Sequence, residues 1–266
     1  MTRAAVLGKP IGHSLSPVIH NAGYAALGLP DWSYTAIECD EAGLPGFVAG
    51  LGPEWAGLSL TMPLKEVALT VATEVSPVAA LVGAANTLVR RGEGWYATNT
   101  DVEGMVNLLR AAGVPAGGRF TVLGAGGTAR AALAAAAQLA AQSVTVVARR
   151  PLTISAVAAD LGLPMTPVLW ADAPGALHAD VVVSTVPKGV ADPIAIHATW
   201  RPATILFDAL YDPWPTPLAD SAARAGSQIL SGRDLLLAQA EGQFRLFTGA
   251  EPPTEAMRDA LRAARS

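Results

Sequence analysis

The sequence predicts an α/β fold, and two observations carry this prediction. Strand-like and helix-like stretches alternate from the N-terminus onward instead of clustering by type. A strand beginning at Phe120 then runs into a glycine-rich turn, an alanine-rich helix over 131–141 and a second strand over 143–148, which together make a βαβ unit. The second half of the chain is therefore expected to contain a Rossmann-type dinucleotide-binding domain.

The expected elements of the first half follow one another in order. Strands are expected over 4–8, 33–38 and 55–60, and helices over 17–27 and 41–50. A further helix is expected after Asp101, because Val102, Val106 and Leu109 share one face at helical spacing.

The second half continues this alternation. A stretch rich in glycine and proline over 113–118 leads into the strand at Phe120, so a domain junction is expected near 103–118. The runs over 180–185 and 204–208 are almost continuously apolar, which predicts buried parallel strands with helices between them. From about Leu235 the chain is expected to be helical to its end.

The glycine-rich turn has the pattern Gly124-x-Gly126-x-x-Ala129. The first glycine permits a tight turn, the second lets the backbone approach a pyrophosphate, and the small third residue lets the helix pack on the strand. The helix N-terminus adds free N–H groups and the positive end of a dipole. The pattern therefore predicts nucleotide binding, with an ordinary glycine-rich turn as the alternative.

The end of the second strand indicates which nucleotide is bound. An NAD-binding domain usually places an acidic residue there to bind the ribose diol, but this chain has Ala148-Arg149-Arg150. Two guanidinium groups suit a 2′-phosphate, which arginine can hold through paired hydrogen bonds. NADP(H) is therefore the expected cofactor; two surface arginines without this role are the alternative.

Composition excludes several classes of protein. The chain has 266 residues, of which 51% are apolar and 15% charged, so it is expected to be globular. A net charge of −4 without any Lys/Arg run argues against a nucleic-acid partner. The single cysteine, Cys39, cannot form an intrachain disulfide, and no Cys/His spacing typical of zinc occurs, so no metal is expected. The sequence shows neither a signal-peptide core nor 18 consecutive apolar residues, so we expect a cytoplasmic protein without a membrane partner.

Two serine hydroxyls stand at the start of the first expected helix. In His13-Ser14-Leu15-Ser16-Pro17, the proline suits the first helical position and Ser16 the N-cap. Hydroxyls beside the positive end of a helix dipole suit a carboxylate, so Ser14 and Ser16 are candidate anion ligands. Simple capping by Ser16 is the alternative.

Thr61 and Lys65 follow the strand over 55–60. Ligands of open α/β sheets lie at the carboxyl ends of strands, and a lysine in such a crevice can protonate a forming alkoxide. Asp101 is the carboxylate expected opposite Lys65. The alternatives are a surface lysine and an aspartate that only opposes the dipole of its helix.

Two further polar side chains occur later in the chain. Tyr211 lies in a proline-rich loop after the run over 204–208 and offers a phenol. Gln239 supplies an amide in the final helical region. Either side chain can instead be an ordinary residue at the edge of the core.

Six separated motifs together resemble the shikimate dehydrogenase family across nearly the whole chain. They occur in the family's order: GxPxxHSxSP at 8–17, TxPxK at 61–65, GAxNT at 83–87, NTDxxG at 99–104, GAGGxxRA at 124–131 and YxPxxTPL at 211–218. The resemblance implies reduction of 3-dehydroshikimate to shikimate with NADPH, in the pathway to chorismate and the aromatic amino acids. It also implies that residues 1–103 form a substrate-binding domain completed by 235–266, and residues 104–234 an NADP-binding Rossmann domain.

The same resemblance implies roles for matching residues. Lys65 and Asp101 match the catalytic pair, which would protonate the alkoxide that forms as NADPH delivers hydride. The implied substrate contacts are Ser14 and Ser16 with the carboxylate, Thr61, Asn86, Asp101 and Gln239 with ring hydroxyls, and Tyr211 in the pocket. The implied cofactor site comprises Gly124, Ala125, Gly126, Gly127, Thr128, Arg130, Arg149, Arg150, Thr185, Val186 and Gly232.

Four positions depart from the family's common pattern. Ser59 replaces an asparagine before the TxPxK motif, Ala148 removes an amide near the ribose phosphate, and Ser184 and Leu235 replace an asparagine and a methionine. These changes are expected to affect packing on the nicotinamide side and the affinity for the cofactor. They leave the Lys65–Asp101 pair intact.

Two alternative functions remain open at this point. One is an NAD-dependent quinate/shikimate dehydrogenase, against which the absence of an acidic residue beside Ala148 argues. The other is a non-catalytic NADP-sensing regulator, since a fold alone does not assign chemistry. The sequence does not indicate the oligomeric state, so a monomer or a homodimer is expected.

Overall fold

The computed structural model describes residues 1–264, which fall into two compact units. The first unit comprises residues 1–101 together with the chain from Leu236 onward, and the second comprises Val102–Leu235. Helices α5 (Thr100–Ala111) and α10 (Gly232–Thr248) each contribute residues to both units. The C-terminal helices therefore belong largely to the same unit as the N-terminal strands.

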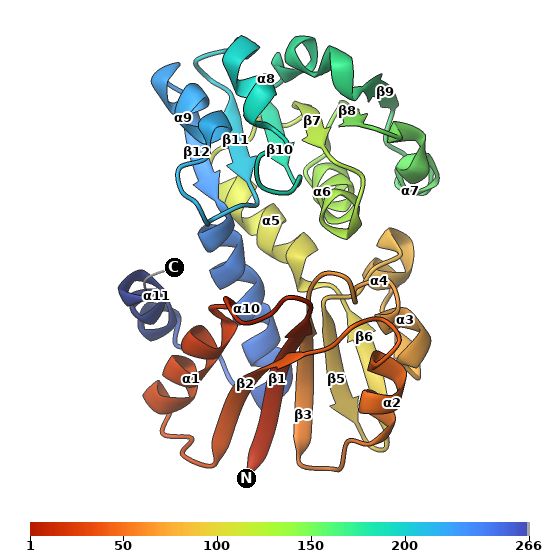
Figure 1. Cartoon of the computed structure of the whole chain (residues 1–266), viewed down its shortest axis with the longest axis vertical. Helices are drawn as coiled ribbons and strands as arrows, with labels where there is room; N and C mark the ends of the chain where they lie inside the picture. Colours follow the sequence, from red (N-terminus) through yellow and green to blue (C-terminus); the bar gives the residue numbers. More distant parts are fainter. Residues whose placement is uncertain (265–266) are drawn as a thin grey trace. The chain divides into compact units, whose positions relative to one another are not determined.

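The first unit is built on a six-stranded sheet in the order β2-β1-β3-β5-β6-β4 (Figure 1). Its strands are β1 (Thr2–Gly8), β2 (Trp32–Glu38), β3 (Trp55–Leu60), β4 (Glu74–Val75), β5 (Thr87–Arg91) and β6 (Gly94–Thr98). Its helices are α1 (Ser16–Ala26), α2 (Leu44–Ala49), α3 (Ala68–Val71), α4 (Pro77–Val82), most of α10, and α11 (Thr254–Ala263). β1, β2 and β3 are parallel, whereas β5 runs antiparallel to both β3 and β6.

Helix α10 packs against the sheet of the first unit at a point where the strand has no side chain. A Cβ placed at Gly57 in β3 would lie 2.0 Å from Cε1 of Phe247 on α10. The ring therefore rests directly on the backbone of β3, a distance that any larger residue at position 57 would prevent. This contact ties α10 to a strand nearly 200 residues earlier in the chain.

The second unit is a parallel sheet with helices around it, in the strand order β12-β11-β10-β7-β8-β9. Its strands are β7 (Arg119–Leu123), β8 (Ser143–Ala148), β9 (Met165–Leu169), β10 (Val181–Ser184), β11 (Ile205–Asp208) and β12 (Gln228–Ser231). Its helices are α5, α6 (Gly127–Gln138), α7 (Ser155–Asp160), α8 (Asp192–His197) and α9 (Pro217–Arg224), with 3-10 turns at Pro151–Ile154 and Trp170–Leu177. Numbered along the unit, the strands follow the order 3-2-1-4-5-6 of doubly wound dinucleotide-binding folds.

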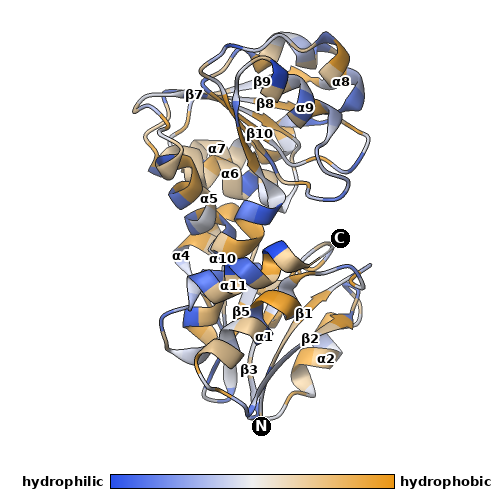
Figure 2. Ribbon diagram, turned by 90° about the vertical axis from the view of Figure 1, so that its left-hand side faces the viewer, coloured by the Kyte–Doolittle hydropathy of each residue, from blue (hydrophilic) through white to orange (hydrophobic). Residues whose placement is uncertain are grey.

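The strands of the second unit form its core. Figure 2 shows most of β8 and β10 in hydrophobic colours, and Val146, Val147, Val182 and Val183 are completely buried. Parallel strands covered on both faces are expected to be apolar along their whole length, so the predicted strands over 143–148 and 180–185 agree with the structure.

Two predicted helices differ from the structure. The helix predicted over 131–141 is α6, which begins at Gly127, directly after the turn, and ends at Gln138 because Ala140 adopts a left-handed conformation (φ 54°). The continuous C-terminal helix predicted from Leu235 is wrong, because the chain breaks between α10 and α11. Gly249 is left-handed there (φ 71°), and Pro252 and Pro253 follow, which is a common way to end a helix.

We expect Gly57→Ala to loosen the packing of α10 on the sheet. The new methyl group would collide with Phe247, and overpacking of this kind costs about 1–3 kcal/mol of the free energy of unfolding. Gly46→Ala is the matched control, since a Cβ at Gly46 in α2 meets no atom within 4 Å, and alanine is favoured over glycine in a helix. Urea unfolding of both variants and of the wild-type protein tests this prediction. A free energy of unfolding in Gly57→Ala equal to that of wild type would contradict it.

Candidate active site

The polar residues at the carboxyl ends of β1 and β3 share one edge of the first unit's sheet. The two strands are parallel neighbours, and the amide of Lys9 donates to the carbonyl of Met62 at 3.0 Å. Ser14 and Ser16 follow β1, and Thr61 follows β3. The structure therefore places the predicted carboxylate ligands and the predicted threonine at the same sheet edge.

Ser16 is not the N-cap that the sequence predicts. Helix α1 begins at Ser16 itself, because Leu15 already has helical dihedrals and makes no side-chain cap. The hydroxyl of Ser14 accepts the amide hydrogen of Ser16 at 3.3 Å. The buried hydroxyl of Ser16 is therefore not used to cap the helix.

Lys65 and Asp101 form an ion pair, with Nζ 2.6 Å from Oδ2. The lysine side chain is 17% exposed and the aspartate side chain 7%, so water screens the pair less than a surface pair. The buried side chain of Leu64 anchors the segment that carries Lys65. Asp101 is held at the start of α5, where its amide donates to Oδ1 of Asn99.

Asn86 joins the ion pair to the surrounding structure. Its Nδ2 donates to Oδ1 of Asp101 at 2.9 Å and to the hydroxyl of Thr100 at 3.0 Å. Its Oδ1 accepts from the amide of Thr100 at 2.8 Å and from the hydroxyl of Thr87 at 2.7 Å. The two oxygens of Asp101 are thus divided between Asn86 and Lys65.

Gln239 and Tyr211 lie in different units. Gln239, on α10, is buried, and its Oε1 is 3.5 Å from Nδ2 of Asn86, so the first unit brings it together with Lys65 and Asp101. Tyr211 belongs to the second unit. Burial raises the pKa of its phenol, and the negative charge of Asp212 raises it further.

The glycine turn lies at the switch point of the second unit's sheet. Gly124 follows β7 and Thr185 follows β10, two adjacent strands whose connections run in opposite directions. Gly124 has φ 115°, and a Cβ there would lie 2.4 Å from Oγ1 of Thr185. Gly126 precedes α6 in an extended conformation, and a Cβ there would meet nothing within 4 Å. The turn therefore presents bare backbone at a helix N-terminus, which is how such folds hold phosphate groups.

The other predicted cofactor residues lie in the turn, at the start of α6, or after strands β8, β10 and β12 of the same sheet. Ala125 lies within the turn, and Gly127, Thr128 and Arg130 form the first residues of α6. Arg149 and Arg150 are exposed directly after β8, and Val186 is buried after β10. Gly232 begins α10, and its amide donates to the carbonyl of Leu210.

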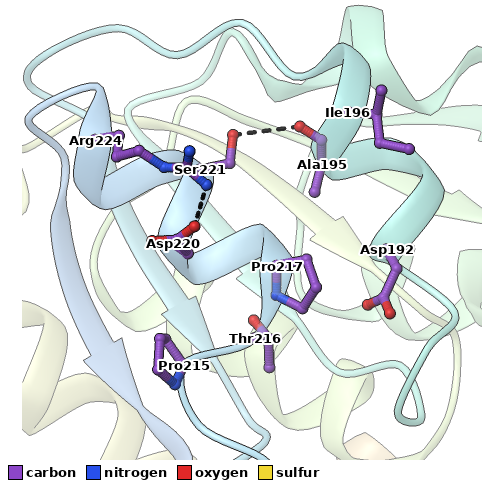
Figure 3. A pocket seen from close by; sticks show the side chains of 9 residues that line it. All are labelled: Asp192, Ala195, Ile196, Pro215, Thr216, Pro217, Asp220, Ser221 and Arg224. Atoms are coloured by element: carbon purple, nitrogen blue, oxygen red, sulfur yellow. Dashed lines mark hydrogen bonds and ion pairs between the residues drawn. The ribbon is translucent and has the colours of Figure 1, made fainter.

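A separate hollow of about 640 Å³ opens beside α8 and α9 (Figure 3). Its lining residues are Asp192, Ala195, Ile196, Pro215, Thr216, Pro217, Asp220, Ser221 and Arg224. Arg224 pairs with Asp220, and the hydroxyl of Ser221 donates to the carbonyl of Ala195. None of these lining residues is among those that the sequence predicts to bind the substrate or the cofactor.

Residues 1–264 offer neither a helix suited to a membrane nor a group of side chains suited to a metal ion. None of the helices there is long and apolar enough to span a membrane. No three His, Cys, Asp or Glu residues in that range gather in a way that could hold a metal ion.

Several residues of interest escaped sequence analysis. Tyr34, Thr87 and Gln243 are buried and linked by hydrogen bonds to the site. Asp208 is buried at the end of β11, where burial raises the pKa of its carboxyl group while the hydroxyl of Thr216 donates to it. Only a polar residue within an apolar run could have pointed to Asp208. Thr87 ends the GAxNT motif at 83–87, which named only Asn86 as a site residue, and no motif marks Tyr34 or Gln243.

The fold and the site together define a class of protein. A 3-2-1-4-5-6 parallel sheet with a glycine turn at its switch point is the architecture of a dinucleotide-binding domain. The other unit offers an enclosed ammonium–carboxylate pair, the kind of group that donates or accepts a proton. This combination is typical of a nicotinamide-dependent dehydrogenase.

Comparison with known proteins identifies the family. The family model "Shikimate dehydrogenase substrate binding domain" matches residues 6–88, and "Shikimate 5'-dehydrogenase C-terminal domain" matches residues 232–262. A shikimate dehydrogenase (NADP(+)) of Thermus thermophilus is 36% identical, and the alignment covers 99% of each chain. The chain belongs to the shikimate dehydrogenase family.

Solved structures agree with this assignment. The crystal structure of Mycobacterium tuberculosis shikimate dehydrogenase matches with a TM-score of 0.88 at 46% identity, covering 99% of each chain. A Thermus thermophilus shikimate 5-dehydrogenase in complex with NADP(H) and shikimate matches with a TM-score of 0.86 at 34% identity, covering 98% of this chain and 99% of that one.

Buried His20 makes stability dependent on pH. Its ring stacks on Tyr34 with centroids 4.1 Å apart, and burial lowers the pKa of its imidazole from 6.5 to about 3. Because the unfolded chain binds the proton more readily, the stability from a neutral His20 is complete above pH 6.5 and falls between pH 6.5 and 3.

We expect His20→Leu to remove this part of the acid sensitivity. One histidine with these pKa values contributes a loss of about 2 kcal/mol between pH 7 and pH 5. Urea unfolding at both pH values should show a smaller loss in the variant than in wild type. His13→Gln, which replaces an exposed histidine, should keep the wild-type dependence; an unchanged loss in His20→Leu would contradict the argument.

Proposed function

We propose that this protein reduces 3-dehydroshikimate to shikimate with NADPH. Its membership of the family supports the reaction, as do near full-length relatives named shikimate dehydrogenase (NADP(+)). The single observation that carries the proposal is the enclosed Lys65–Asp101 pair, bonded to Asn86 and adjacent to Gln239. The relatives do not favour an NAD-dependent quinate enzyme or a non-catalytic sensor.

The residues of the second unit fit a dinucleotide phosphate. Gly124 has no room for a side chain, and Gly126 leaves open space beside an exposed backbone at the start of α6. These groups would bind the pyrophosphate, and Arg149 and Arg150 would bind the 2′-phosphate, because no carboxylate follows β8. When bound, NADPH supplies the hydride.

The first unit supplies the groups that bind substrate and move the proton. Ser14 and Ser16 bind the substrate carboxylate through their hydroxyls at the start of α1. Thr61, Asn86 and Gln239 orient the ring through its hydroxyls. Lys65 Nζ donates its proton to the oxygen that develops negative charge at the former ketone, and Asp101 holds the ammonium in place.

In the reverse direction the same pair removes the proton from the alcohol. Lys65, then neutral, accepts it, and the carboxylate of Asp101 stabilises the ammonium that results. The cytoplasm is the expected location, because the single cysteine Cys39 suits a reducing compartment. Either a monomer or a homodimer is compatible with this scheme.

A four-way assay tests the proposal. NADP⁺ and NAD⁺ are each supplied with shikimate and with quinate, and absorbance of the reduced cofactor is followed. We expect turnover with shikimate and NADP⁺, and much less with the other pairs. Preferred use of quinate with NAD⁺ would instead support the catabolic alternative, and binding of NADPH without turnover in any combination would support the sensor.

Replacement of Lys65 tests the proton step. Lys65→Ala should lower kcat by about 10²–10⁴ with a modest change in KM for shikimate, the range expected when a general acid–base is lost. Lys9→Ala is the control, since Lys9 forms an exposed ion pair with Asp40 and should turn over normally. A Lys65→Ala variant with near-normal kcat would remove Lys65 from the mechanism.

A further inference from the structure

A continuous series of buried hydrogen bonds leads from strand β2 to the carboxylate of Asp101. The phenol of Tyr34 donates to the hydroxyl of Ser59 at 2.6 Å, and Ser59 donates to Oε1 of Gln243 at 2.7 Å. Nε2 of Gln243 donates to the hydroxyl of Thr87 at 3.0 Å. From Thr87 the bonds continue through Asn86 to Asp101, as described above.

Every member of this series is shielded from water. The six residues, all buried, are Tyr34, Ser59, Gln243, Thr87, Asn86 and Asp101. They come from β2, β3, α10, β5 and its preceding residue, and α5, so no single element could position them. A buried polar group without a partner is costly, and each of these groups has one.

Backbone groups fix the direction of the series at two points. Gln243 Nε2 also donates to the carbonyl of Asn86 at 3.2 Å, so its Oε1 must face Ser59, and Ser59 must donate to it. Asn86 Oδ1 accepts from the amide of Thr100, so its Nδ2 must face Asp101. Because a hydroxyl has one proton to give, Ser59 can then only accept from Tyr34, and every donor along the series points toward Asp101.

We propose that Tyr34, Ser59 and Gln243 are positioning residues for the reaction, which orient Asn86 and through it Asp101. This inference rests on the proposed function. With Asn86 fixed, one carboxylate oxygen of Asp101 is occupied and the other faces Lys65. Loss of Ser59 leaves Oε1 of Gln243 without its donor, so Gln243 is held only through Nε2, and its contacts with Thr87 and the backbone of Asn86 loosen. A small displacement of a reacting group is enough to slow an enzyme.

The chain offers a matched control for the phenol of Tyr34. Tyr24 lies in the same aromatic cluster and is equally buried, yet its hydroxyl makes no hydrogen bond among the residues described. Tyr34→Phe and Tyr24→Phe therefore remove the same group from similar surroundings, and only the first interrupts the series.

Steady-state kinetics of these variants test the proposal. Ser59→Ala should lower kcat for shikimate about 10-fold and Tyr34→Phe about 3-fold, the range of a lost buried hydrogen bond, with KM for NADP⁺ unchanged. Tyr24→Phe should match wild type. The double variant Tyr34→Phe/Ser59→Ala should be no slower than Ser59→Ala, because the series is interrupted once in both. A kcat equal to wild type in Ser59→Ala, with only its unfolding midpoint lowered, would reduce the series to a structural role and overturn the proposal.

A second measurement does not depend on turnover. The side-chain amide signals of Asn86 in ¹⁵N NMR spectra, assigned with Asn86→Ser, should shift in Ser59→Ala and stay in place in Tyr24→Phe. Unchanged signals in Ser59→Ala would overturn the positioning role even in an active enzyme. A wild type without shikimate turnover would reject the proposed function, and these spectra would then decide the orientation of Asn86 separately.

Discussion

The contact between Phe247 and the bare backbone of Gly57 is the constraint on which the first unit depends. It places α10 directly on β3, and α10 carries both Gln239 and Gln243. Without that helix the sheet edge would lack the amide that Thr87 and the backbone of Asn86 use. The candidate active site is therefore complete only when the last part of the chain has packed on the first.

Burial explains why the residues around Asp101 are so fully paired. A carboxylate removed from water requires compensating donors, and here Lys65 and Asn86 supply them. Both polar atoms of the Asn86 side chain, Nδ2 and Oδ1, also form hydrogen bonds with Thr87 or Thr100. The nearby aromatic cluster follows a different rule, since His20 and Tyr24 keep unpartnered polar atoms within the described residues and are stabilised by packing.

Periodicity and turn chemistry predicted the architecture well where a local signal was strong. The strands β3 and β8 agree residue for residue with the ranges 55–60 and 143–148. The hairpin of β5 and β6 was missed, although Gly92, left-handed at φ 58°, lies between them. β5 carries Arg90 and Arg91 beside its apolar residues, so no apolar run marked it. Pairing of β5 with β3, and of β6 with β5, rather than local pattern makes these segments strands.

Motifs along the chain were sufficient to name the ion pair, the glycine turn and the family, because the chemistry of these groups is visible in the residue types themselves. That Lys65 lies 2.6 Å from Asp101, and that Gln243 reaches a residue more than 150 positions earlier, could be decided only by the packing of separate elements. Sequence by itself determined which functional groups the protein has. The tertiary structure determined their distances and the direction of their hydrogen bonds, because these follow from burial and from contacts between residues distant in the chain.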